Sequence, residues 1–437
     1  MRKNFEKRDE MIKKQLSLIS PTEREIKILT LEISNFVFRL NSELRKIDAF
    51  AIIGGSFAKG TIIKGKRYDL DLFARFDYNK YVSREKQQIS ELLFKILRKI
   101  NKLDIETLHG SRDYFRVYLK KAEKLIGIPV YVEIVPVLAV KKAEESVNVT
   151  DVSPLHILYV LDKIKKNPEL ADSIKLAKSL CYGQGCYGAE SHIKGFSGYC
   201  LELLCIHFGS FIELLKAASE WNLKKKIIID MPKFYKNKDM LMIEMNEAKT
   251  LPPLILVDPV QPDRNAAAAV SPEKLEIFIK AARAFIKNPS LRLFIKKEAN
   301  EKEMQSAAKS KRMSLISIVA ESGKGKEDIA GAKLFKLFNM LLERFKKEGR
   351  ADGKWVYNEE ERKAKFFFLF KPEKKIIVKG PPVNLEKNVK MFRKKWPRSF
   401  VKAGNVYARR KSKGVKEIIS LPKEQMAGMG ISKIKLV

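Results

Sequence analysis

Apolar residues recur at helical spacing near the start of the chain. They are Ile26, Leu29, Ile33, Phe36, Val37 and Leu40. Ser20, Pro21 and Glu23 precede this run in the order of a capping box, with serine as the N-cap and proline at the first helical position. We therefore expect a helix that starts beside Ser20 and packs against a domain. Residues 83–100 predict a second amphipathic helix.

Between and after these helices the pattern is that of strands. Residues 51–53 are apolar and are followed by Gly54-Gly55-Ser56, after which a second apolar segment carries Asp69 and Asp71. Two further segments, 112–121 and 128–138, are rich in β-branched and aromatic residues and also predict strands. The first part of the chain therefore mixes helices with a sheet.

The middle of the chain is mostly helical, and the last part mixes both kinds of element. Helical segments are expected near 154–166, 172–183, 197–221 and 271–287, with a short strand at 227–229. Residues 295–312 are charged and non-periodic, which indicates a boundary or an exposed linker. Strands at 313–319, 355–357 and 364–370 and a helix at 329–348 follow. We predict an α+β protein of three parts, about 1–145, 146–295 and 296–437.

The charge of the chain points to a polyanionic partner. Lys and Arg number 87 against 52 acids, a formal net charge of +35, so nucleic acid or an acidic membrane face would be attracted. Residues 371–416 hold 16 Lys and Arg against two acids, interleaved with Phe392, Trp396, Phe400 and Tyr407. Such a mix tracks phosphates and stacks on bases. The alternatives are that the lysines are solvated surface and the aromatic residues are core.

Cysteine spacing and the N-terminus predict no zinc site and no export. Cys181, Cys186, Cys200 and Cys205 lack the short spacing of a zinc knuckle, and the last two lie in an apolar run, where cysteine acts as a small hydrophobe. The first residues form no signal peptide, and no segment reaches 18 uncharged apolar residues. We expect a soluble, cytoplasmic protein with no membrane partner.

Three acids form the main candidate for chemistry. Asp69 and Asp71 lie one residue apart on a strand and share a face, where they repel unless a cation lies between them. The Gly55-Ser56 turn, which 12 intervening residues separate from Asp69, offers backbone N–H groups to phosphate. Glu133 is a lone acid in a β-branched run and needs a partner. These acids indicate a metal site for nucleotide chemistry; the alternatives are solvated acids on a strand face or an edge strand.

With these residues in this order, the chain resembles the nucleotidyltransferase superfamily that includes DNA polymerase beta. Longer blocks narrow the resemblance to the archaeal (class I) CCA-adding enzymes. The blocks are GCYGAESHIKGFSGYCLELLCIHFGSF (185–211), IIID (227–230), VDPVQPDRNAAAAVS (257–271), NPSLRLF (288–294), KGPPVNLEKNVKMF (379–392) and AGNVYARR (403–410). Residues 300–350 and the last 20 or so match poorly. The resemblance implies a polymerase-beta-type head with a mixed sheet, a helical nucleotide-selecting neck, and an α+β body and tail that bind tRNA.

The resemblance also implies a reaction and its residues. The family adds C, C and A to the 3′ end of tRNA from CTP and ATP without a nucleic-acid template, using two Mg²⁺ ions and releasing pyrophosphate. Asp69, Asp71 and Glu133 would be the catalytic metal ligands. The implied nucleotide-binding residues are Gly55, Ser56, Lys59, Ser153, His156, Lys178, Tyr187 and Arg264. Arg264 would recognise C or A, because an arginine fork suits the amino group and acceptor that these bases share.

Two residues depart from the family, and two other functions stay open. Glu133 stands where the family usually has aspartate, and Lys59 where arginine is common. Another RNA nucleotidyltransferase, such as a poly(A) polymerase or oligoadenylate synthase, would share the three acids. A catalytically dead protein that binds RNA is the other alternative. The expected partner is the acceptor arm of tRNA, and the sequence leaves the oligomeric state open, a homodimer included.

Overall fold

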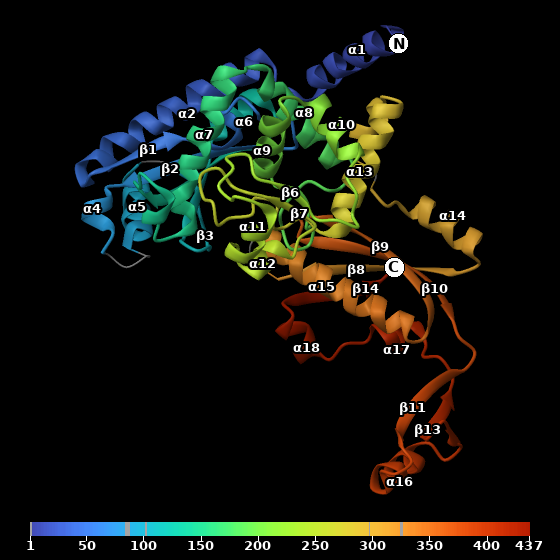
Figure 1. Ribbon diagram of the computed structural model, residues 1–437. Helices are drawn as coiled ribbons and strands as arrows, with labels where there is room; N and C mark the ends of the chain where they lie inside the picture. The colour runs from blue at the N-terminus through green and yellow to red at the C-terminus, as the bar shows by residue number, and fades with distance from the viewer. Residues whose placement is uncertain (1, 84–87, 101–102, 297, 324–326) are drawn as a thin grey trace. The chain divides into compact units, whose positions relative to one another are not determined.

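The computed structural model describes residues 2–83, 88–100, 103–296, 298–323 and 327–437 (Figure 1). The chain divides into two compact units, residues 1–297 and 298–437. The first unit contains both the sheet and the helices that the sequence predicts for residues 1–295. The boundary that we expect near residue 145 lies inside this unit and stays a prediction.

The first unit is built on a five-stranded mixed sheet in the order β1-β2-β5-β4-β3. The strands are β1 (Ala49–Ile53), β2 (Tyr68–Phe76), β3 (Ile105–Leu108), β4 (Tyr114–Tyr118) and β5 (Val130–Leu138). β2 and β5 are parallel, and the other neighbours are antiparallel. The predicted mixed sheet is confirmed, although β3 was not expected.

Helices cover both faces of this sheet. On one face lie α2 (Glu23–Leu44), α5 (Gln88–Lys99) and α6 (Lys120–Ile126), which form a core with Leu70 and Leu72 of β2. On the other face Phe73 of β2 packs against Ile157 of α7 (Ser153–Lys166). Since side chains alternate along a strand, Asp69 and Asp71 share the face of Phe73, toward α7. α3 (Gly55–Ala58) and α4 (Tyr78–Tyr81) complete this part, whereas α1 (Arg2–Ile19) packs against α8 (Glu169–Gly183) of the helical core.

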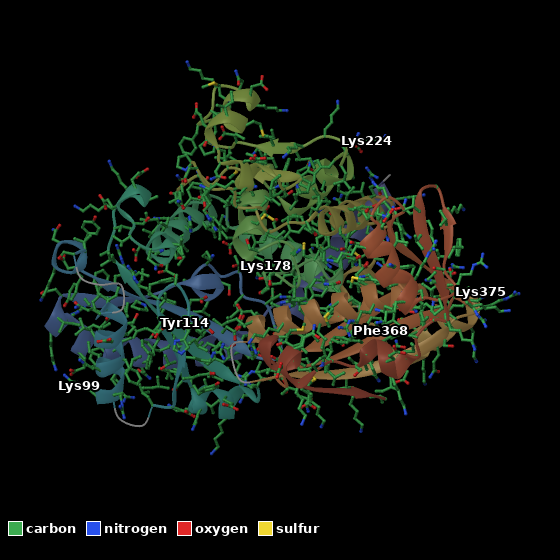
Figure 2. All side chains as sticks on the ribbon, turned by 90° about the horizontal axis from the view of Figure 1, so that it is seen from below. Lys99, Tyr114, Lys178, Lys224, Phe368 and Lys375 are labelled. Atoms are coloured by element: carbon green, nitrogen blue, oxygen red, sulfur yellow. The ribbon has the colours of Figure 1, made fainter. Side chains whose placement is uncertain are left out.

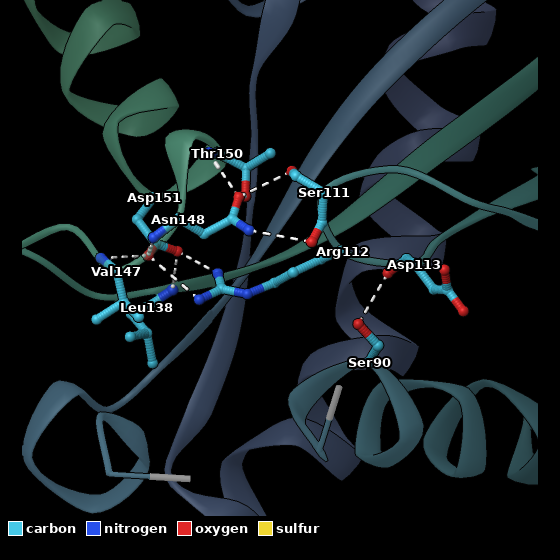
Figure 3. A network of polar contacts seen from close by, with 9 residues as sticks. All are labelled: Ser90, Ser111, Arg112, Asp113, Leu138, Val147, Asn148, Thr150 and Asp151. Carbon is cyan, nitrogen blue, oxygen red and sulfur yellow. Dashed lines mark hydrogen bonds and ion pairs between the residues drawn. The ribbon is translucent and has the colours of Figure 1, made fainter. Parts of the chain in front are cut away.

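A buried ion pair anchors the chain between β5 and α7 (Figure 3). Asp151 is fully buried and pairs with the guanidinium of Arg112, which is 4% exposed. The same carboxylate accepts hydrogen bonds from the backbone N–H groups of Leu138 (2.9 Å), Val147 (3.2 Å) and Asn148 (2.9 Å). Asp151 thereby ties the end of β5 to the start of α7, two elements that carry predicted site residues.

The remainder of the first unit is a helical core. It is formed by α8 (Glu169–Gly183), α9 (Gly198–Phe208), α10 (Phe211–Ser219) and α13 (Pro272–Lys287), and all four cysteines are buried in it. A two-stranded parallel sheet, β6 (Ile227–Ile229) with β7 (Leu254–Leu256), and the short helices α11 (Lys238–Glu244) and α12 (Glu247–Thr250) lie beside it. Among the described residues no single helix is long and apolar enough to cross a membrane. α9 and α10 reach that length and composition only as a pair, bent by 91°.

Two details of these helices differ from the prediction. The cap of α2 is Thr22, paired with Glu25 in a capping box, because Ser20 directly follows α1 and its N–H donates to Leu16 of that helix. The helix expected over 197–221 is two helices, since Gly209 takes φ 83° and Ser210 caps α10. Glycine adopts this left-handed conformation without strain and so ends α9.

The second unit has an antiparallel sheet in the order β14-β8-β10-β9. Its strands are β8 (Ser314–Ser322), β9 (Gly349–Asn358), β10 (Lys363–Pro372) and β14 (Ile431–Leu436). Phe366 and Phe368 of β10 belong to the core with α15 (Glu327–Lys346), whereas Phe367 packs with α14 (Glu301–Lys311). The charged stretch 295–312, expected to be non-periodic, therefore contains a helix, which Asn300 caps and which buries Met304 and Ala308.

The basic stretch 371–416 folds mainly into a small three-stranded sheet with one helix. The strands β11 (Ile376–Pro382), β13 (Asn405–Arg410) and β12 (Phe400–Lys402) are antiparallel, and α16 (Glu386–Lys395) packs beside β11. Phe400 and Tyr407 stack with ring centroids 5.8 Å apart, and both rings are only partly buried. α17 (Val415–Ile419) and α18 (Lys423–Gly428) lead to β14.

Candidate active site

Two of the three predicted catalytic acids lie opposite each other in the sheet. The parallel register of β2 and β5 pairs Asp71 with Glu133 and Asp69 with Tyr131. Asp71 is partly buried and Asp69 is 48% exposed. Burial, Glu133 and then Asp69 raise the pKa of Asp71 to about 7. Such a carboxyl group is both buried and close to like charges, and a bound cation would favour its ionised form.

The third acid already has a cation beside it. Arg116 of β4 lies opposite Glu133 in the sheet, and its guanidinium donates to Glu133 Oε1 at 2.8 and 3.3 Å. The same guanidinium covers the ring of Tyr131, 4.2 Å from its centroid. Within the described part of the chain, no three acids, histidines or cysteines gather closely enough to hold a metal ion. Glu133 as a metal ligand therefore stays a prediction.

The glycine turn lies directly against Asp71. The N–H of Gly54 donates to the backbone oxygen of Asp71 at 2.8 Å, and Gly54 caps the short helix α3, which contains Gly55 and Ser56. Gly55 has φ +61°, and a Cβ atom on it would lie 1.6 Å from Asp71 Oδ2. Only glycine fits here, because any side chain would occupy the space of the carboxylate.

Behind this turn lies a buried cluster of two lysines and one glutamate. Lys59 follows α3, Lys178 is on α8, and Glu202 is on α9; Lys178, which is labelled in Figure 2, is 3% exposed. Glu202 Oε2 lies 2.7 Å from Lys59 Nζ, and Oε1 lies 3.3 Å from Lys178 Nζ. Thr61 Oγ1 accepts a hydrogen bond from Lys178 at 3.0 Å. The positive charges of both lysines oppose the rise in the pKa of Asp71. The lysine cluster is therefore close enough to the acids to act on Asp71.

Tyr187 belongs to the same cluster. A Cβ atom on Gly198, the first residue of α9, would lie 3.2 Å from the Tyr187 hydroxyl and 3.5 Å from Lys178 Cε. Burial raises the pKa of Tyr187, and the charges of Glu202 and Asp71 add to this shift. The tyrosine therefore stays neutral beside Lys178.

A second cluster forms around Asp258, which is fully buried. It pairs with His156 Nε2 at 3.1 Å and with Arg264 at 2.5 Å, and it accepts from the Tyr199 hydroxyl at 3.0 Å. Arg264 is 40% exposed and lies over the ring of Tyr199, 5.5 Å from its centroid. Asp258 thereby brings His156 and Arg264 together, two residues predicted from distant parts of the sequence.

Helix α9 connects the two clusters through Tyr199 and Glu202. Neither residue was predicted from the sequence as part of the site. Tyr199 and Glu202, three residues apart, lie on one side of the helix; burial and Asp258 raise the pKa of Tyr199, and Glu202 adds to this shift. Glu202 stands inside the apolar run CLELLC, a signal of the same kind that singled out Glu133. Asp258 lay in a matching block but offered no such signal. Ser153 begins α7, one turn before His156.

Comparison with known proteins finds a matching family model and several relatives of this chain. Residues 172–295 match the family model described as tRNA nucleotidyltransferase, second domain. A protein of Nanoarchaeum equitans named CCA-adding enzyme is 33% identical over 341 residues, 77% of this chain and 78% of that protein. One of the same name from Methanocaldococcus jannaschii is 29% identical over 414 residues, 92% and 87% of the two chains.

Among solved structures, a cytoplasmic RNA terminal U-transferase matches with a TM-score of 0.49 and 13% identity, over 67% of this chain and 100% of that one.

Proposed function

The chain belongs to the CCA-adding enzymes, and from this premise we propose how its residues add C, C and A to the 3′ end of tRNA. The observation that carries the proposal is the meeting of three groups in the first unit: the acids of β2, the buried lysines and the Asp258–Arg264 pair. The acids would hold the metal at the reacting phosphate, the lysines would bind the leaving pyrophosphate, and Arg264 would contact the base.

Asp69 and Asp71 hold divalent metal, which we propose is magnesium. Burial, Glu133 and Asp69 raise the pKa of Asp71 to about 7 although two lysines lower it, and this supports the proposal because carboxylates that share a face need a counter-charge. When bound, magnesium would neutralise the triphosphate and favour ionisation of the attacking 3′ hydroxyl. Glu133 would complete the set by exchanging its contact with Arg116 for the metal. Because Gly55 has no side chain, the Asp71 carboxylate can lie directly against it.

The lysine cluster receives the β- and γ-phosphates. Lys59 and Lys178 offer two ammonium groups within one buried cluster, and the Tyr187 hydroxyl offers a further donor. Ser56 and the N–H groups of its turn add neutral donors from the side of β2. Ammonium groups act as point charges here, which suits the leaving pyrophosphate.

Arg264 selects the base. Its guanidinium is held on one side by Asp258 and remains 40% exposed on the other, so its remaining N–H donors can reach a nucleotide. His156, held by the same carboxylate, lies on α7 one turn after Ser153, and both would contact the sugar or the triphosphate. A fixed fork of donors discriminates between base edges better than a mobile one.

The partner is tRNA, and we propose that the basic sheet of residues 371–416 contacts its backbone. Phe400 and Tyr407 are partly exposed among its cations, with Arg409 over the Phe400 ring at 4.9 Å. A-form RNA is recognised largely through its backbone and shape. Replacing four lysines there by glutamine should weaken tRNA binding and reduce its salt dependence by up to about four in slope. An unchanged slope would contradict this contact.

Extension of tRNA tests the function directly. A transcript that ends at the discriminator base is incubated with the full chain, magnesium and CTP, ATP or both. We expect two additions with CTP alone and three with both nucleotides. Unlimited addition of A without CTP would instead favour a poly(A) polymerase. Loss of addition in Asp71→Asn with tRNA binding retained would exclude a catalytically dead protein that binds RNA.

A further inference from the structure

Two lysines that we propose as phosphate ligands share one buried carboxylate. Glu202 is 1% exposed, Lys178 is 3% exposed and Lys59 is 9% exposed. One oxygen of Glu202 contacts Lys59 at 2.7 Å and the other contacts Lys178 at 3.3 Å. Each ammonium group therefore has its own oxygen, and one glutamate determines how far apart the two charges lie.

The charges of this cluster depend on one another. Burial lowers the pKa of Lys178, Glu202 raises it and Lys59 lowers it again. Without the carboxylate, two ammonium groups would face each other in a poorly solvated space and one would tend to lose its proton. Glu202 therefore opposes the loss of a proton from Lys178, and its carboxylate pairs with both ammonium groups.

The three groups come from separate elements of the first unit. Lys59 follows α3 beside the sheet, whereas Lys178 and Glu202 belong to the helices α8 and α9. Thr61 completes the connection, since its hydroxyl accepts from Lys178 at 3.0 Å and lies 3.5 Å from Glu202 Oε1. Glu202 thus fixes the position of Lys59, which lies beside the sheet, relative to Lys178, which belongs to the helical core.

We propose that Glu202 is a positioning residue for the leaving pyrophosphate. It holds the ammonium groups of Lys59 and Lys178 on its two oxygens, where both can turn to a polyphosphate, without touching the nucleotide itself. This inference rests on the proposed function, because it takes the two lysines as phosphate ligands. Since CTP and ATP carry the same triphosphate, Glu202 should affect both nucleotides equally and leave the choice of base unchanged.

Binding of inorganic pyrophosphate tests the proposal without tRNA. Titration of the full-length Glu202→Gln variant with pyrophosphate and magnesium should give a Kd at least about tenfold above wild type, as for the loss of one charge-assisted contact. In tRNA extension, KM for CTP and ATP should rise by similar factors, and kcat should change less. An unchanged or lower Kd would overturn the proposal.

Two further variants separate positioning from folding. Glu348→Gln removes a buried carboxylate that binds Arg410 in the second unit, and it should leave pyrophosphate binding unchanged. Glu202→Asp keeps the charge but is one methylene shorter, so it cannot reach both lysines; its Kd should rise about threefold or more with less loss of thermal stability. Wild-type affinity in Glu202→Asp would contradict positioning. Extension of tRNA by the wild-type chain is measured separately. Its failure would contradict the proposed function, whereas an unchanged pyrophosphate Kd in Glu202→Gln would contradict only the role of Glu202.

Discussion

Replacing Gly55 by alanine should abolish most activity while the protein stays folded. A Cβ atom at this position would lie 1.6 Å from Asp71 Oδ2, although such atoms keep at least 3.0 Å apart. Either the turn or the carboxylate must therefore move by at least 1.4 Å. The rotation of Asp71 away from the turn is the cheaper movement, and it changes the geometry of the acid that we assign to the metal.

The size of the effect follows from this displacement. A misplacement on the order of 1 Å at a reacting centre costs about 100-fold in rate. The left-handed backbone, φ +61°, adds roughly 1–2 kcal/mol of strain for a residue with a Cβ atom, and this strain lowers stability only. We expect kcat for CTP addition to fall by about 100-fold or more, with a modest loss of free energy of unfolding.

Gly127→Ala is the matched control. Gly127 also has a positive φ, +89°, at the end of α6, but a Cβ atom there would have no heavy atom within 4 Å. Both variants carry backbone strain, and only Gly55→Ala disturbs Asp71. Initial rates of CTP addition and thermal unfolding are measured for both. Equal rates for the two variants would refute the reasoning, because strain alone would then account for the loss.

Three further predictions concern single buried acids and their partners. Arg112→Met should lower the free energy of unfolding by about 3–5 kcal/mol, since it leaves Asp151 buried without its cation; denaturant unfolding measures this, and a loss below about 1 kcal/mol would argue against the anchor. Asp258→Asn should loosen Arg264 and raise misincorporation of U or G by about tenfold; single-nucleotide additions measure it, and unchanged selectivity would oppose the assignment. Hydrogen bonds from Arg410 hold the pKa of Glu348 below its usual range. The contribution of ionised Glu348 to the free energy of unfolding is therefore full above the ordinary pKa of a glutamate and is lost as the pH falls through the lowered pKa. Thermal unfolding between pH 6 and about pH 3 should therefore show less acid destabilisation in Glu348→Gln, and identical pH curves would exclude this contribution.

Much of this protein could be predicted from local pattern. Strand periodicity put Asp69 and Asp71 on one face, and β2 with its buried Leu70 and Leu72 bears this out. The helices of the middle part were also predicted, because amphipathic spacing is a property of the segment alone. One error occurred where a single residue decided the outcome, at Gly209, whose left-handed φ ends α9.

The partners of the acids were decided only by the tertiary structure. The parallel register of β2 and β5 put Glu133 opposite Asp71, and β4 supplied Arg116 to the same carboxylate. Glu202 meets Lys59 across 143 positions of the chain. A periodic pattern reports which side of an element faces a core, because that depends on neighbours in sequence. Which charge meets which carboxylate depends on the register and packing of elements far apart in sequence, and those arise only when the chain folds.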